Sequence, residues 1–231
     1  MPHVTRVTLY VSALQLVCVC VRQMEIQIVN TWDGEPVDHD PMVMSLRPHP
    51  EGLGLQLGVT APFFNDPPAP HSDPGQPCHQ LWDYEVVEMF FLNDQMEKYL
   101  EVELCPHGQH LVLLLDGRRK IWKDDLPLDF EVMPLEDESN GVRRWQGHAL
   151  VPWRYLPPGV CKFNAYAIRG SGEARVYEAL FPVPKHKVQP GMQPDFHRLE
   201  YFGDLDLPAL MGNDWIQPDS EIWSARLVGK P

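Results

Sequence analysis

The chain has 231 residues, of which 44% are hydrophobic, so it can form one large domain with a sizeable core. Its formal net charge is -13 at pH 7, and a surface this acidic repels phosphate backbones, so we expect no nucleic-acid partner. The densest basic cluster, Arg118, Arg119, Lys120 and Lys123, follows a turn and is typical of a solvated loop. The 24 prolines are dispersed among apolar runs, which favours short strands and many loops over long helices.

The N-terminal segment differs from the rest of the chain. Residues 7–21 (VTLYVSALQLVCVCV) form an apolar run after Arg6 and resemble the core of a signal peptide. The run is short for a transmembrane span, and no other segment could cross a membrane, so we expect no membrane partner. Met24 opens EIQIVNTWDG, an alternating strand followed by a turn. We therefore predict an N-terminal extension over residues 1–23, either an upstream start or a signal-like segment, and a single domain over residues 24–231.

Three of the five cysteines, Cys78, Cys105 and Cys161, lie outside this extension. No pair has the spacing of a zinc finger, and an odd number favours free thiols in a reducing compartment. We therefore expect a cytoplasmic protein, with secretion as the alternative if residues 1–23 act as a signal peptide.

In chain order, the elements after residue 24 are mostly short strands separated by turns. The loop 62–77 (PFFNDPPAPHSDPGQP) is proline-rich, residues 106–109 connect a hairpin, and residues 124–127 and 136–141 are polar connections. Near the C-terminus, EYFGDLDL can hold a last strand and residues 206–212 a helical turn. Strands are expected at 25–32, 42–46, 53–61, 84–92, 99–105, 110–115, 129–133, 144–151, 161–168 and 175–181. This spacing predicts an all-β protein, an antiparallel β-sandwich.

Acidic residues interrupt the most apolar strands. If WDYEVVEMFF (82–91) is extended throughout, Trp82 and Glu88 share one face of its strand. In the next strand, Tyr99, Glu101 and Glu103 share the face opposite three apolar residues, so they face away from the core. Aromatic rings stack on sugar C–H groups, and carboxylates accept hydrogen bonds from hydroxyls, so these five residues are the candidate ligand site. The alternative is the ordinary solvated face of an antiparallel sheet.

The pattern resembles the central region of the family 9 carbohydrate-binding modules and their DOMON-like relatives. WDYEVVEMFF followed by YLEVELCPHGQ has their Trp, a Glu six positions later, and a Tyr-led strand of alternating acids ending near a Pro-x-Gly turn. PDFHRLEYFGDLDL (194–207) is similar to their closing segment. Residues 24–223 also resemble an uncharacterised vertebrate family of this superfamily, through TWDG, APFF, DPPAP, LWDYEVVE and ELCPHGQHLVLLL.

This resemblance implies a sandwich that binds a sugar or glycoconjugate without catalysis. By analogy with those modules, Trp82 is one aromatic clamp and Glu88 accepts from sugar hydroxyls. The Arg of those modules falls near Glu103, which is an acid here, and Phe181 or Trp153 is the candidate second clamp.

Glycoside hydrolysis is a weaker interpretation of the same acids. Glu101 and Glu103 lie two apart on one strand, so about 7 Å separates their Cα atoms, which is compatible with a carboxylate pair. However, acids on an open strand lack the enclosing pocket that raises a pKa. We therefore expect a non-enzymatic protein with no catalytic residues.

Metal and haem sites have candidate ligands but no convincing motif. His107 and His110, with Cys105 and Glu103, could approach one another across the hairpin, although a histidine in a turn is usually solvated. Met89 and His197 are candidate haem ligands, but no motif selects them. We expect His197 to anchor the closing segment instead. We therefore expect no metal and no cofactor.

A protein partner is the alternative to a carbohydrate ligand. The loop 62–77 could present Phe63 and Phe64 to a partner in an intracellular interaction domain that keeps the fold without sugar binding. The same loop could instead cover a sheet edge.

Overall fold

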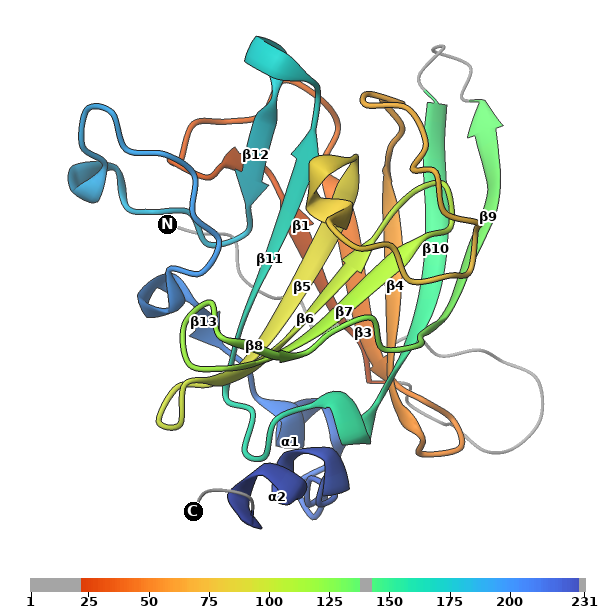
Figure 1. Cartoon of the computed structure of the whole chain (residues 1–231), viewed down its shortest axis with the longest axis vertical. Coiled ribbons are helices and arrows are strands. Elements are labelled where there is room, and N and C mark those ends of the chain that lie inside the picture. Colours follow the sequence, from red (N-terminus) through yellow and green to blue (C-terminus); the bar gives the residue numbers. More distant parts are fainter. Residues whose placement is uncertain (1–21, 138–142, 229–231) are drawn as a thin grey trace.

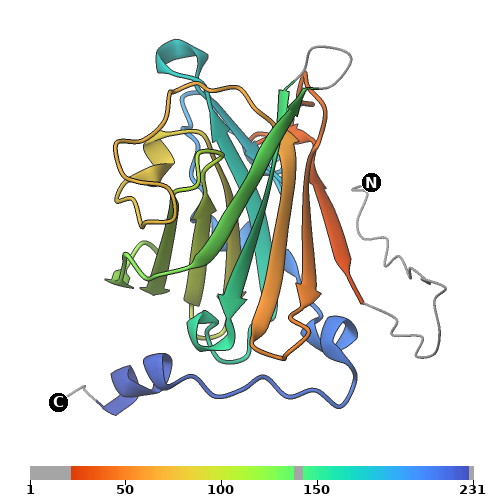
Figure 2. The same cartoon turned by 90° about the vertical axis from the view of Figure 1, so that its right-hand side faces the viewer.

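The computed structural model describes residues 22–137 and 143–228. Most of the predicted extension, including Cys18 and Cys20, and part of the predicted connection 136–141 therefore lie outside the described residues. The described part is two antiparallel sheets packed face to face, and the predicted β-sandwich is confirmed (Figures 1 and 2).

The first sheet has the strand order β1-β3-β4-β10-β9, and all its pairs are antiparallel. Its strands are β1 (Met24–Ile28), β3 (Met42–Pro48), β4 (Gly54–Pro62), β9 (Asp129–Asp137) and β10 (Arg143–Pro152).

The second sheet has the order β2-β12-β11-β5-β6-β7-β8, with β13 paired to β11. Its strands are β2 (Asn30–Thr31), β5 (Val86–Asn93), β6 (Lys98–Leu104), β7 (His110–Asp116), β8 (Ile121–Lys123), β11 (Lys162–Arg169), β12 (Val176–Ala179) and β13 (Gly203–Asp204). The proline-rich loop precedes β5, and residues 194–202 precede β13.

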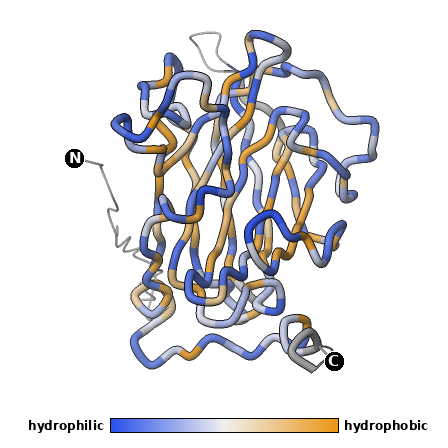
Figure 3. Tube along the Cα trace, turned by 60° about the vertical axis from the view of Figure 1, so that its left-hand side comes forward, coloured by the Kyte–Doolittle hydropathy of each residue, from blue (hydrophilic) through white to orange (hydrophobic). Residues whose placement is uncertain are grey.

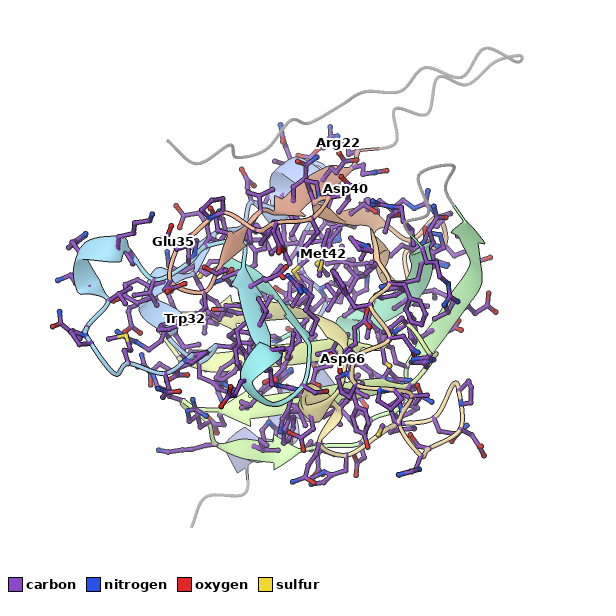
Figure 4. All side chains as sticks on the ribbon, turned by 90° about the horizontal axis from the view of Figure 1, so that it is seen from above. Arg22, Trp32, Glu35, Asp40, Met42 and Asp66 are labelled. Atoms are coloured by element: carbon purple, nitrogen blue, oxygen red, sulfur yellow. The ribbon has the colours of Figure 1, made fainter. Side chains whose placement is uncertain are left out.

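The main core fills the space between the sheets. Met42 lies inside it, whereas Arg22 and Asp40 lie at the rim (Figure 4). Apolar residues alternate along the strands, so each sheet turns one apolar face inward, and the hydropathy-coloured tube shows orange concentrated in the strands (Figure 3).

A second, smaller core lies on the outer face of the second sheet. Leu81, Leu199 and Phe202 cover Phe90 and Tyr99 there, and all five side chains are buried. They come from segments far apart in the sequence, so an outward sheet face that was expected to be solvated is largely covered.

The predicted start of the central strand is wrong. Leu81–Asp83 forms a 3₁₀-helix, η1, because Gln80 adopts a left-handed backbone and the amides of Asp83 and Tyr84 bond to the carbonyls of Gln80 and Leu81. Trp82 therefore lies on this turn rather than on β5.

Two helices follow the last strand, α1 (Leu207–Met211) and α2 (Glu221–Val228). They lie across one end of the sandwich (Figures 1 and 2). The predicted helical turn at 206–212 is confirmed as α1, whereas α2 and the short strand β8 were not predicted. Within the described residues, no helix is long and apolar enough to span a membrane.

Candidate functional site

Pairing of the central strands brings the predicted acids together. Glu88 lies directly opposite Glu103 in the β5–β6 register, and Phe90 lies opposite Glu101. The alternate residues of both strands, including Val87 and Val102, pack into the main core. The acids therefore share the outer face of the second sheet with Tyr99, as the alternation predicted.

These acids are buried rather than solvated. Glu88 is 2% exposed, Glu101 4% and Glu103 0%. Both carboxyl oxygens of Glu103 and one carboxyl oxygen of Glu101 are sealed from solvent. The solvated-face interpretation is wrong for these positions, because η1 and residues 194–202 cover the sheet.

Burial changes the acidity of all three side chains. Loss of hydration raises the pKa of Glu101 to about 8. A hydrogen bond from Glu103 and the positive charge of Arg119 act in the opposite direction and limit this rise. Burial, followed by repulsion from neighbouring carboxylates, raises the pKa of Glu88 and of Glu103 well above the ordinary value. The prediction that these acids lack an enclosing pocket is therefore wrong.

Tyr99 links this face to the closing segment. Its hydroxyl lies 2.8 Å from Nδ1 of His197 and accepts a 2.9 Å bond from the backbone N–H of Arg119. Burial, with the nearby charge of Arg119, lowers the pKa of His197 to about 4. The imidazole is therefore neutral at pH 7, so Nδ1 can accept the Tyr99 proton, and His197 anchors the segment as predicted.

A cavity of about 370 Å³ opens above the acids. Its lining includes Trp82, Glu88 and Glu101, so three of the five predicted site residues meet at one place. Tyr99 and Glu103 are not part of the lining and lie beneath it on β6. The remaining wall comes from β7, β8 and the turn between them, from β11 and β12, and from the closing segment: Leu113, Leu115, Arg119, Ile121, Ile168, Tyr177, Pro194, Asp195, Phe196 and His197.

Arg175 holds the Trp82 turn against the sheet. Its guanidinium donates to the carbonyl oxygens of Trp82 and Asp83, the latter at 2.9 Å. On the closing segment, Phe196 stacks on Tyr166 with a centroid distance of 4.0 Å and meets Tyr177 edge-on. Trp82, Tyr177 and Phe196 therefore supply aromatic surface to one cavity.

The predicted second clamp is not at this cavity. Trp153 is buried in the main core, where its indole N–H donates to Gly52, and Phe181 packs against Phe163. Tyr177 and Phe196 occupy the cavity wall instead, and the motif PDFHRLEYF was the available signal for Phe196.

Arg119 is the other missed residue. It was interpreted as part of a solvated loop, yet it lines the cavity and forms a 2.6 Å ion pair with Asp195. Its backbone has a φ of 59°, and its amide is held by Tyr99. Sequence spacing alone does not show this approach, because the two partners are 76 residues apart.

The candidate metal and haem ligands do not converge. In the part of the chain that the structure describes, His79, Asp124 and Asp125 form the group with three ligand atoms within 4.8 Å of one another; all three are exposed, and none was predicted. His110 instead accepts the backbone N–H of Leu128. Met89 lies in the main core and His197 on the opposite face of the sheet, so they cannot bind one haem.

Comparison with known proteins places the chain in a family. It is 54% identical over 200 residues to the human UPF0462 protein C4orf33, and this match covers 87% of the chain and 96% of the human protein. The homologues in mouse and zebrafish are also 54% identical over 200 residues. The chain belongs to the UPF0462 family. The predicted vertebrate family is thereby confirmed, while no family model matches the chain.

The UPF0462 fold is shared with a bacterial protein. A crystal structure from Bacteroides uniformis, titled "putative carbohydrate-binding protein", superposes with a TM-score of 0.52 at 15% sequence identity. The superposition covers 80% of this chain and 85% of that one. At this identity the likeness concerns the fold.

Proposed function

We propose that this UPF0462 protein binds a carbohydrate or glycoconjugate, without catalysis, in the cavity beside Trp82. This proposal rests mainly on the convergence of Trp82, Glu88 and Glu101, which come from three separate elements (η1, β5 and β6), on one cavity. Aromatic surface for sugar C–H groups and carboxyl oxygens for hydroxyls are the two parts of a sugar site. The fold likeness and the resemblance to family 9 modules support the same ligand class.

The size of the cavity supports a small ligand. Cavities of about 300–1,000 Å³ hold small molecules, and this one lies near the lower end. Arg119, Asp195 and His197 add further hydrogen-bonding groups to the wall. A mono- or disaccharide fits this combination of volume and polarity better than a long glycan chain.

The acidity of the wall supports binding rather than hydrolysis. A glycosidase needs one carboxyl that is protonated and a second that is ionised. The two strand carboxyls that line the cavity beside Trp82 both have raised pKa values, to about 8 for Glu101 and well above the ordinary value for Glu88, while the third carboxyl of the wall, Asp195, is bound to Arg119. Because neither Glu88 nor Glu101 is the ionised carboxylate that hydrolysis needs, we assign this pair no hydrolytic role.

Trp82→Ala should remove sugar binding. A thermal-shift screen of the full chain against mono- and disaccharides measures it, because a ligand at 100 times its dissociation constant stabilises a protein by about 2.7 kcal/mol. Trp82 is partly exposed and contributes its ring to the wall, so its loss should abolish the shift while the folded state persists.

Trp215→Ala is the matched control. Trp215 is also partly buried, but it packs against Trp153 and does not line the cavity. This variant should therefore keep the ligand-induced shift. A screen in which no sugar stabilises the folded wild type contradicts the proposal. Capture of a protein partner then becomes the experiment of choice.

A further inference from the structure

The buried acids have no basic partner. Glu88, Glu101 and Glu103 form no ion pair with any described residue, and no N–H group in the described ranges donates to the sealed oxygens of Glu101 and Glu103. Glu101 and Glu103 form a side-chain hydrogen bond with each other. An unpaired buried carboxylate is strongly disfavoured, so the protein keeps these groups protonated at a cost to its stability.

Nearby arginines do not neutralise them. Arg119 is bound to Asp195, and Arg175 donates to backbone carbonyls of the Trp82 turn. Both arginines act on the acids at longer range. The wall therefore carries three acids, Glu88, Glu101 and Asp195, against one guanidinium.

The aromatic residues of the wall also favour a cationic ligand. Trp82, Tyr177 and Phe196 line the same cavity, and the face of an aromatic ring attracts cations. Acid groups without counter-charge and several rings around one cavity are the features that bind an organic ammonium group.

Resting on the proposed function, we propose that the ligand carries an ammonium group, as in an amine-bearing sugar, with Glu88 and Glu101 as its counter-ions. Glu103, fully buried behind them, holds its proton and bonds to Glu101. The sugar ring lies on Trp82, and its ammonium group faces β5 and β6. Binding then gives the two wall acids the partner that the free protein lacks.

A bare metal ion fits the acids less well. A divalent cation needs several oxygen ligands around one point. The described acids of the wall do not bring three carboxyl oxygens within 4.8 Å of one another, whereas an ammonium group on an extended ligand can donate in several directions.

Binding of such a ligand should release protons. Glu101 has a pKa of about 8, so the free protein holds its proton at pH 7, and the ammonium group favours the ionised form. Affinity should therefore rise between pH 6 and pH 8. The titratable and charged groups that act on these acids or face them are Cys78, Tyr99, Glu103, Arg119, Tyr166, Arg175, Tyr177, Asp195 and His197.

Isothermal titration of the full chain with matched glycosides tests the inference. The probes are the 2-aminoethyl and the ethyl β-glycosides of glucose, galactose and mannose, which differ only in the ammonium group. We expect at least about tenfold tighter binding of one aminoethyl glycoside than of its ethyl counterpart, from charge-assisted bonds to buried carboxylates. Titration at pH 7 in two buffers of different ionisation enthalpy should show proton release for the aminoethyl probe alone.

Two variants locate the effect. Glu88→Gln and Glu101→Gln keep the side-chain shape and remove the group that ionises when the ammonium binds, so each should bring the affinity ratio of the two glycosides close to one. Glu131→Gln is the control, because Glu131 is exposed on β9 of the other sheet. It makes the same Glu-to-Gln exchange away from the cavity and should leave the ratio unaltered.

The outcomes separate this inference from the proposed function. Equal affinity for both glycosides overturns the ammonium inference and leaves sugar binding standing. If no glycoside binds, but tetramethylammonium binds and Glu88→Gln weakens it, the ammonium inference stands and sugar binding fails. If neither glycosides nor tetramethylammonium binds, both are overturned.

Discussion

At the scale of single residues, Glu101 makes folding stability depend on pH. Its pKa is about 8 in the folded protein, against an ordinary value of 4.5. A raised carboxyl pKa stabilises the fold fully below about pH 4.5, and this contribution is lost as the pH rises through about 8. Glu101→Gln keeps the shape of the side chain but does not titrate. The stability of the variant relative to the wild type should therefore increase as the pH rises.

Thermal unfolding of both proteins at pH 5.5 and pH 8.5 measures this difference. The titration of His197, on which Glu101 does not act, is common to both proteins and cancels, whereas Glu88 and Glu103 titrate together with Glu101. The Tm advantage of the variant should be larger at pH 8.5 by at least about 3 °C, because about 1 kcal/mol shifts the Tm of a domain this size by about 2–4 °C. An advantage that is the same at both pH values would mean that Glu101 titrates normally.

The outward orientation of Glu101 and Glu103 could be predicted from alternation, but their burial could not. Glu101 and Glu103 lie on the outward face that the strand period assigned to them. Their cover comes from η1 and from residues 194–202, about 90 residues away. Local sequence patterns do not show such a contact, which is why the raised pKa values and the roles of Arg119 and Phe196 were missed.

At the scale of elements, Glu85 fixes the start of the proline-rich loop. Its carboxylate accepts the backbone N–H groups of Phe64 at 3.1 Å and Asn65 at 2.6 Å. Phe63 and Phe64 are half-buried against the main core, with Arg143 and Arg169 over their rings. These two side chains therefore pin the loop to the sandwich, and the loop start is not a free surface for a partner.

Glu85→Gln should loosen this loop. The amide retains one acceptor oxygen and turns an NH₂ group toward the second backbone N–H, so one buried donor loses its partner at about 1–3 kcal/mol. Hydrogen exchange of residues 62–67 should become faster, while exchange in β6 stays slow. Unchanged exchange in residues 62–67 would show that the aromatic contacts alone hold the loop.

Strands with strong alternation could be predicted to within a few residues, and elements without it could not. The apolar runs of β5, β6 and β7 defined their strands, as did the hairpin at 106–109. β8 has three residues that lie at the sheet edge, two of them exposed, so its sequence carries little apolar signal. η1 was missed because its Leu-Trp-Asp sequence continues the composition of the following strand, and only the left-handed Gln80 ends the extended chain.

At the scale of the whole molecule, the sandwich is a scaffold with one covered sheet face. The first sheet and the main core support β5 and β6 from behind, while η1 and the closing segment form the front wall of the cavity. The UPF0462 relatives match over 200 residues, which is most of this chain. The cavity is therefore built from the middle of the chain and from the closing segment, and it should be lost whenever the closing segment detaches from the sheet.

Binding of an amine-bearing sugar beside Trp82 is tested most directly by a crystal structure of the full chain with the 2-aminoethyl β-glycosides of glucose, galactose and mannose at saturating concentration. We expect one glycoside in the cavity, with its ring on Trp82 and its ammonium nitrogen within hydrogen-bond distance of Glu88 or Glu101. A cavity that stays without sugar at saturation, or a glycoside bound elsewhere on the sandwich, would contradict it.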